Sequence, residues 1–300
     1  MRSLAVLLLA LSSAQSIAAA DTWSGVERIV AVGDVHGDYD QFVRILEQTE
    51  LIDSETNWIG GRTHLVQTGD VPDRGPDSRK VFDLLMKLEK QARKAKGYVH
   101  ALVGNHEAMN VYGDLRYVHP GEFEAFKKRE ASDDAEHPAG WVEHRKALGP
   151  TGRYGRWIGK HNVVIKINRT LFLHGGIGPR YAQATIRELN QQAREELADL
   201  GLTPGGMLID NEGPLWYRGL AQNDEATETA HLEALLALHG VDRIVIGHTT
   251  TDGGIVSRFG GRVVQIDVGM SEAYGGHLGV LILEGDEAFA IEEGVRRKLP

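Results

Sequence analysis

The stretch HALVGNHEAMN, residues 100–110, ends an apolar run on Gly104 and then offers three polar side chains in a row. These are Asn105, His106 and Glu107. A polar group at the end of a buried strand needs a partner, because an unpaired polar group costs free energy when it leaves water. Nothing obvious nearby supplies one, so the stretch predicts partners from elsewhere in the chain.

A similar arrangement occurs earlier, where the apolar run of residues 28–32 leads into GDVHG, residues 33–37. Side chains two positions apart in an extended segment project on the same side, so Asp34 and His36 can point at one spot. A carboxylate and an imidazole aimed together can bind a metal ion. A capping or turn role for these two residues remains an alternative.

The run of residues 64–68 leads into a third such motif, GDVPDRG, residues 69–75. Asp70 repeats the Gly-Asp arrangement, and one carboxylate can bridge two cations. Asp73 and Arg74 follow, and an arginine at this place can hold a phosphate or carboxylate with two parallel hydrogen bonds. The alternative is that Asp73 caps a helix and Arg74 is exposed.

Two later apolar runs end on histidine: LFLHGG contains His174, and IVIGHT contains His248. A lone histidine on an apolar strand is more often a hydrogen-bonded core residue, and that interpretation holds for His64 and His100. Ligands of α/β sheets, however, bind beyond the carboxyl ends of the strands. The joint pattern therefore favours ligand roles for His174 and His248.

The whole chain alternates apolar, β-branched runs with helical patterns, which predicts an α/β architecture. Pairs of strands near the C-terminus suggest hairpins. The expected helices are one that begins at Pro76, with Val81, Leu84, Leu85 and Leu88 on one face, and two more over residues 179–200 and 226–239. The expected strands are residues 28–32, 64–68, 98–103, 162–167, 170–174, 242–248, 262–268 and 278–284.

Residues 108–160 interrupt this alternation, because they contain helical pieces but no clear strand. We interpret them as a mainly helical insertion over one end of the sheet that shapes a substrate entrance, with Trp141 and Trp157 available to grip a peptide. A surface excursion without such a role is the alternative.

Residues 1–20 have the features of a secretory signal peptide: a positive charge at Arg2, a short apolar core, and alanines at 18–20. We expect the mature chain to begin at Asp21 and to be secreted or periplasmic, without stable membrane insertion; a retained N-terminal anchor is the alternative. The net charge of −9 argues against nonspecific nucleic-acid binding. Since the chain has no cysteine, disulfides and thiol chemistry are excluded.

In this order, the motifs GDVHG, GDVPDRG, GNHE, HGG and GHT resemble those of the calcineurin-like metallophosphoesterases, in the phosphoprotein phosphatase branch. The sequence is most similar to the bacterial, Shewanella-like subgroup, because Val103 precedes GNHE where eukaryotic enzymes usually carry Arg, and because DVGMSEAYGG (267–276) stands in place of a Ser-Ala-Pro-Asn-Tyr motif. The resemblance implies one catalytic domain over residues 21–300, built as a two-sheet β-sandwich flanked by helices.

The resemblance also implies two metal ions, and ligands without sulfur suit Mn, Fe or Zn. It assigns Asp34 and His36 to the first metal and Asp70 to a bridging position. The residues that it assigns to the second metal are Asn105, His174 and His248. Two such cations can turn a shared water into an attacking hydroxide and clamp the phosphoryl oxygens.

The remaining motif residues take roles in catalysis by the same resemblance. His106 is the general acid that protonates the departing alcohol, oriented by Asp73. Arg74, and Arg218 in LWYRG, pair with phosphate oxygens, although Arg218 could instead be a surface cation. Tyr274 falls where the family places an aromatic near the metals.

The expected function is that of a phosphomonoesterase acting on phosphorylated proteins or peptides, at phosphotyrosine, phosphoserine or phosphothreonine. One alternative is a hydrolase of dinucleoside polyphosphates or another small phosphate ester; the enzymes that cleave dinucleoside polyphosphates usually have Ala in place of Asp73 and Asp in place of Glu107. A non-catalytic metal-binding or phosphate-sensing protein is the other alternative.

Overall fold

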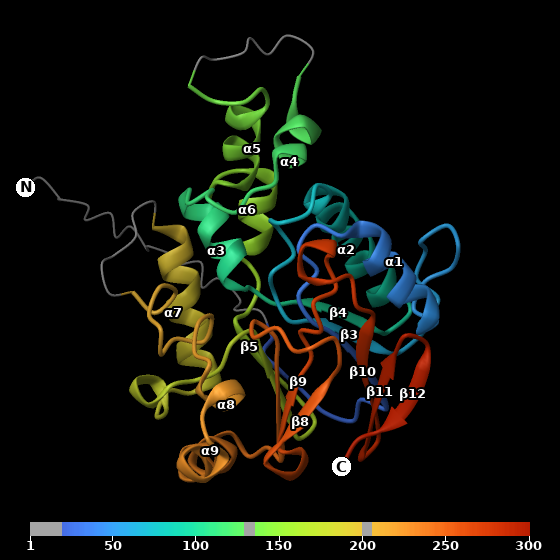
Figure 1. Ribbon diagram of the computed structural model, residues 1–300, viewed down its shortest axis with the longest axis vertical. Coiled ribbons are helices and arrows are strands. Elements are labelled where there is room, and N and C mark those ends of the chain that lie inside the picture. The colour runs from blue at the N-terminus through green and yellow to red at the C-terminus, as the bar shows by residue number, and fades with distance from the viewer. Residues whose placement is uncertain (1–19, 129–135, 200–205) are drawn as a thin grey trace, which may run out of the picture.

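Two six-stranded sheets pack face to face, with helices on their outer surfaces, in the computed structural model of the chain (Figure 1). The structure describes residues 20–128, 136–199 and 206–300. Helices α1 and α2, residues Tyr39–Gln48 and Ser78–Lys94, lie on one side of the sheets, and α7, residues Ile186–Ala198, lies on the other. The predicted α/β sandwich is confirmed.

One sheet combines a parallel half with an antiparallel half, in the order β12-β11-β10-β2-β3-β4. Strands β2, β3 and β4 run parallel, so their carboxyl ends meet at one edge, whereas β10 pairs antiparallel with both β2 and β11. The bounds are β2 Arg28–Val32, β3 His64–Gln67, β4 Tyr98–Ala101, β10 Gly279–Glu284, β11 Glu287–Glu292 and β12 Val295–Lys298.

The second sheet has the order β1-β5-β6-β7-β9-β8. Here β6, β7 and β9 are parallel, and β5 and β8 are antiparallel to their neighbours β6 and β9. The bounds are β1 Thr22–Trp23, β5 Val164–Ile167, β6 Thr170–Leu173, β7 Arg243–Ile246, β8 Val256–Arg258 and β9 Val263–Gln265.

Strand β2 shows why the sequence forms this sandwich. Ile29 and Ala31 belong to the apolar core between the two sheets, while Val30 and Val32 belong to the core under the helices. Successive side chains of a strand point to opposite faces, so a strand covered on both faces is apolar throughout. The unbroken apolar run of residues 28–32 is therefore typical of a central strand.

The sequence predicts the buried faces of the helices better than the residues at which the helices begin. The predicted face of α2 is buried, and the helix begins after Asp77, two residues beyond Pro76. The helix expected from residue 179 begins only at Ile186, where Thr185 and Glu188 form a capping box. Helix α9, Glu225–His239, lies as expected, and the short α8, Gly219–Gln222, precedes it.

The described part of residues 108–160 is helical, as predicted, and contains no strand. Helices α4 and α5 rise above the rest of the molecule (Figure 1). The bounds are α3 Asn105–Tyr112, α4 Pro120–Phe126, α5 Trp141–Leu148 and α6 Arg153–Ile158. Across the described residues, no helix has both the length and the apolar character to cross a bilayer.

Some elements were not predicted, namely α1, β1, β8, β11 and β12. The predicted hairpins near the C-terminus are present, but they join β8 to β9 and β10 to β11. Strands β9 and β10, which the sequence does predict, lie in different sheets. The predicted signal peptide falls on residues 1–20, of which 1–19 lie outside the described residues.

Candidate metal centre

The six side chains predicted as metal ligands converge at one end of the two sheets, and all six are buried. They follow strands of both sheets, because β2 and β3 precede Asp34 and Asp70 while β6 and β7 precede His174 and His248. The backbone N–H of His248 donates to Asp34 Oδ1 at 3.1 Å, which joins the two sheets at this point. The centre is therefore made where both sheets end together.

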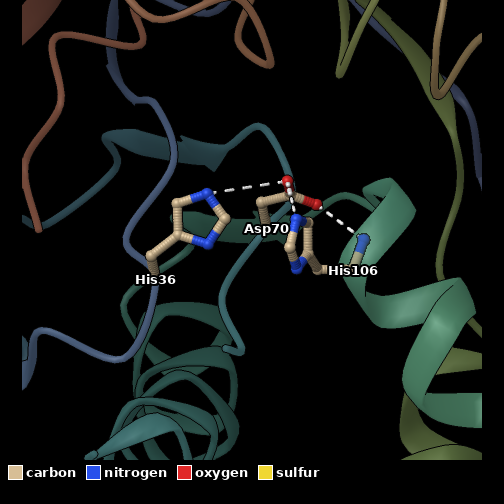
Figure 2. A group of neighbouring side chains, drawn as sticks. All are labelled: His36, Asp70 and His106. Carbon is tan, nitrogen blue, oxygen red and sulfur yellow. Dashed lines mark hydrogen bonds and ion pairs between the residues drawn. The ribbon is translucent and has the colours of Figure 1, made fainter. Parts of the chain in front are cut away.

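His36, Asp70 and His106 form one group of possible ligand atoms (Figure 2). His36 Nε2 lies 3.9 Å from Asp34 Oδ2 and 3.8 Å from Asp70 Oδ2. Its other nitrogen, Nδ1, donates to the carbonyl of Pro72 at 3.1 Å. That bond sets the tautomer and leaves the Nε2 lone pair for a cation.

A second group consists of Asp70, His174 and His248. His174 Nε2 lies 3.3 Å from Asp70 Oδ2 and 2.9 Å from Asn105 Oδ1, and His174 Nδ1 lies 3.0 Å from the carbonyl of Thr68. A neutral imidazole has a single N–H, so donation to Thr68 leaves Nε2 facing oxygen lone pairs. A cation among these atoms would satisfy all of them.

Two further observations test whether the residues fit cations. His248 Nε2 is buried and has no hydrogen-bond partner among the described residues. Burial raises the pKa of Asp34 well above its usual value, and the neighbouring carboxylates of Asp267 and Asp70 add to that shift. Clustered buried carboxylates are costly without positive charge beside them. The oxygen and nitrogen donors therefore fit two divalent cations, and Asp70 belongs to both groups of donor atoms.

His106 and Asp73 form a hydrogen-bonded dyad beside this centre. His106 Nδ1 donates to Asp73 Oδ2 at 2.6 Å, and His106 Nε2 faces Asp70 Oδ2 at 3.7 Å (Figure 2). Burial opposes the charged imidazolium, but the carboxylates of Asp70 and Asp73 outweigh it and raise the pKa of His106. The side chain is thus suited to carry a proton, although its distances alone would also permit a ligand role.

The two predicted arginines flank the centre. The Arg74 guanidinium carbon lies 4.1 Å from the ring centre of Tyr117 and 5.6 Å from that of Tyr274. Arg74 Nε is buried and has no hydrogen-bond partner in the part of the chain that the structure describes. Arg218 donates through Nη1 to the carbonyl of His248 at 2.8 Å. Both guanidinium groups are therefore beside the candidate ligands, and Arg218 is half-buried there.

Backbone strain is concentrated in these motifs. The φ angles of His36, Asp70, Asp73, Arg74 and His248 are 47°, 59°, 75°, 68° and 63°. Side chains other than glycine rarely adopt positive φ, and such strain persists where the surrounding structure enforces it.

Glycines permit the close approaches that the strained motifs require. A Cβ at Gly104 would lie 2.3 Å from Asp70 Oδ1, and one at Gly247 would lie 2.4 Å from Asp34 Oδ1. Real Cβ atoms do not approach oxygen so closely, which explains the Gly that precedes the polar residues in these motifs.

Several residues of the centre were not predicted. Glu107 accepts from the backbone N–H groups of Gly104, Asp70 and Val71 at 2.7 to 2.8 Å, so it holds two of the motifs together. Asn110 Nδ2 donates to Asp73 Oδ1 at 2.8 Å.

Asp267 is buried and accepts from Thr250 Oγ1 at 2.8 Å, close to Asp34. It lies near the end of the run 262–268, two residues after β9 ends at Gln265, so the rule that polar residues at strand ends form the site would have found it.

The predicted aromatic Trp157 is not at the centre. Its Nε1 donates to Glu89 Oε2 at 3.0 Å, and its ring packs against Phe82 and His161. Tyr117, which was not predicted, lies there instead, with its ring centre 5.2 Å from that of His106. Tyr117 thus lies beside the dyad, and Tyr274 lies beside the candidate ligand His36, with 5.0 Å between their ring centres.

This fold and this paired arrangement of histidines and carboxylates define a metal-dependent phosphoesterase that uses two metal ions. The chain belongs to the calcineurin-like phosphoesterase family, whose model matches residues 27–252.

Relatives match most of the chain. Shewanella-like protein phosphatase 2 of Arabidopsis thaliana is 30% identical over 82% of this chain and 72% of its own length. An uncharacterised protein of Schizosaccharomyces pombe is 39% identical over 90% of this chain and 81% of its own length. The crystal structure of a cold-active protein-tyrosine phosphatase from a psychrophilic Shewanella species superposes with a TM-score of 0.79, at 33% identity, over 94% of this chain and 83% of that one.

Proposed function

We propose that this protein is a protein phosphatase that removes phosphate from phosphorylated proteins or peptides, phosphotyrosine included. The observation that carries the proposal is the dyad of His106 and Asp73, whose protonatable imidazole faces the candidate metal ligand Asp70 at 3.7 Å. Two relatives that match most of the chain, Shewanella-like protein phosphatase 2 and the cold-active protein-tyrosine phosphatase, are named as protein phosphatases. A purely metal-binding or phosphate-sensing protein would not need this acid.

The metal ligands follow from the two groups of donor atoms. Asp34, His36 and Asp70 would hold one divalent cation. The other cation would be held by Asp70 together with Asn105, His174 and His248. Two such cations, for which Mn, Fe and Zn are the candidates, lower the pKa of water and neutralise phosphoryl oxygens.

The side chains outside the ligand set handle the leaving group and the phosphate. His106 Nε2 donates its proton to the departing ester oxygen, while the bond from Nδ1 to Asp73 keeps the ring in place. Arg74, whose Nε has no partner within the described ranges, and Arg218 bind phosphate oxygens. A cavity of about 400 Å³ adjoins Arg74, lined also by Tyr39, Pro76, His119 and Glu272, and can take a substrate side chain.

A panel of substrates tests this function. The metal-loaded protein should hydrolyse a phosphotyrosine peptide and a phosphoserine peptide with a higher kcat/KM than a dinucleoside tetraphosphate, and Asp70→Asn should abolish all of these activities. A preference for the dinucleoside tetraphosphate would replace the proposal with the small-ester alternative. Turnover that survives Asp70→Asn would refute the metal-dependent mechanism.

We also propose that residues 1–20 are removed as a signal peptide and that the mature protein is secreted or periplasmic. The positive charge at Arg2, the short apolar core and the alanines at 18–20 support this.

The protein's N-terminus in its native host tests that proposal. Mass spectrometry should find Asp21 as the first residue, in a fraction outside the cytoplasm. An intact Met1 in the cytosolic fraction would refute it.

A further inference from the structure

We propose that Glu122, in the helical insertion, is a positioning residue for the general acid His106. It acts through Ser78 and Asp73, so that the insertion holds the catalytic dyad in its working geometry. The inference rests on the proposed function, because it assigns Glu122 to the same proton transfer.

A continuous chain of buried hydrogen bonds joins the insertion to the dyad. Glu122 Oε1, on α4, accepts from the backbone N–H of Ser78 at 2.8 Å. Ser78 Oγ accepts in turn from the backbone N–H of Asp73 at 3.2 Å, and Asp73 Oδ2 accepts from His106 Nδ1 at 2.6 Å. All four residues are buried, so water does not substitute easily for any of these contacts.

The segment that this chain supports would not hold its conformation unaided. Asp73 and Arg74 both have positive φ, at 75° and 68°, and neither is glycine. A second contact from the insertion supports the same segment, because the backbone N–H of Arg74 donates to the carbonyl of Tyr117 at 3.0 Å. The Tyr117 ring also covers the Arg74 guanidinium at 4.1 Å. Residues 117–122 therefore brace the strained pair from two sides.

The chemistry of Glu122 suits a role beside Asp73. Its Oε2 is buried and has no hydrogen-bond partner among the described residues. Burial raises the pKa of Glu122 to about 8, and the carboxylates that face it, Asp73 and Asp77, contribute to the shift. An uncharged carboxyl group adds no second negative charge beside Asp73, whose Oδ2 accepts from His106 Nδ1. Glutamine has the same shape and is also uncharged, so it should replace Glu122.

The leaving group of the substrate supplies the test. An alkyl phosphate needs protonation of its leaving oxygen, whereas p-nitrophenyl phosphate needs little. In the metal-loaded full chain, Glu122→Ala should lower kcat for the alkyl phosphate at least about tenfold more than for p-nitrophenyl phosphate. Glu122→Gln should keep both rates within about threefold of the wild type. Equal losses on both substrates for Glu122→Ala would overturn the inference.

Matched variants separate this role from stability and from the proposed function. Glu124→Ala, an exposed glutamate on the same helix, should change neither rate. Ser78→Ala removes the middle contact with a small change in volume and should reproduce the selective loss even if Glu122→Ala fails to fold; equal losses would again contradict us. If the loss in His106→Ala does not depend on the leaving group, the general-acid mechanism fails. If the loss in His106→Ala depends on the leaving group but the losses in Glu122→Ala and Ser78→Ala do not, only the inference about Glu122 fails.

Discussion

Asn105 and His106 are adjacent in the sequence, yet their side chains have different partners. Asn105 Oδ1 lies 2.9 Å from His174 Nε2, at the candidate metal ligands, while His106 Nδ1 donates to Asp73. Their backbone belongs to the first turn of α3, where consecutive side chains diverge by about 100°. This divergence separates a candidate ligand from a candidate acid within one motif.

Substituting each of these residues should therefore have different effects. Asn105→Ala should weaken metal retention, whereas His106→Ala should keep both metals and lose turnover. The loss for an alkyl phosphate should be roughly 10²- to 10⁴-fold, and smaller for p-nitrophenyl phosphate. Metal analysis with steady-state kinetics on both substrates checks this, and loss of metal from the His106 variant would make His106 a ligand.

Glu122 should make the stability of the protein depend on pH. Its pKa rises from 4.5 to about 8 on folding, mainly through burial, so the folded state binds the proton more tightly than the unfolded state. Stability from this group is present below the unfolded pKa and is lost as the pH rises towards 8, by at most about 1.4 kcal/mol per pH unit.

Glu122→Gln removes that titration. The wild type should lose stability between pH 5 and pH 8 through Glu122, whereas the variant should not. In denaturant titrations, the free energy of unfolding of Glu122→Gln minus that of the wild type should therefore increase over this range. The exposed Glu124→Gln variant should show no such trend. If the difference between Glu122→Gln and the wild type stays constant over this range, the pKa of Glu122 is the same in the folded and unfolded states.

At the scale of elements, one part of the insertion contacts the site and another part packs against the core. The segment that leads into α4 contributes Tyr117 to the dyad and Arg74. Helix α6, in contrast, turns Trp157 towards α2, where it bonds to Glu89 and packs on Phe82. The same insertion thus contains a site-facing aromatic and a structural one.

The two aromatics should respond differently to substitution. Trp157→Ala should lower the free energy of unfolding by roughly 3 kcal/mol, since it leaves a cavity, without changing selectivity among phosphopeptides. Tyr117→Ala should raise KM for the same peptides, because Arg74 loses the ring that orients it. Denaturant unfolding and kinetics on a phosphopeptide panel check both. Altered selectivity in the Trp157 variant would show that Trp157 contributes to the substrate entrance.

At the scale of the whole molecule, the candidate metal centre lies where the two sheets end together. Asp34 follows β2 of one sheet and accepts from the backbone of His248, which follows β7 of the other. Buried carboxylates that repel one another occupy this junction, and cations would compensate for them. Metal binding should therefore stabilise the packing of the sheets as well as supply the chemistry.

Removing the metals should consequently lower the melting temperature of the whole domain. A ligand at a thousand times its Kd adds about 4 kcal/mol to stability, so the shift should be several degrees or more. Thermal unfolding of chelator-treated and manganese-loaded protein measures it, with Asp70→Asn as the control that should respond less. Identical melting temperatures with and without metal would show that the junction is stable without cations.

The sequence alone was sufficient for the eight strands that it predicted and for the types of residue at their ends. Both are local properties: a strand buried on two faces is apolar throughout, and Gly followed by Asp or Asn marks where it turns. The strands β1, β8, β11 and β12 escaped prediction, because short or exposed strands leave a weaker apolar pattern; Val295 in β12, for example, is 68% exposed.

The resemblance to a known family paired Asp73 with His106, but only the tertiary structure decided which residues outside the motifs support them. The hydrogen bond of Glu122 to Ser78 joins residues 44 positions apart, and no sequence pattern indicated it. The position of Trp157 against α2, and of Tyr117 over Arg74, follows likewise from how the insertion packs. Hydrophobic periodicity tells which face of an element is buried but not which neighbour covers it, because the hydrophobic effect does not depend on direction. A hydrogen bond or a ring contact, in contrast, requires one particular partner in the right geometry.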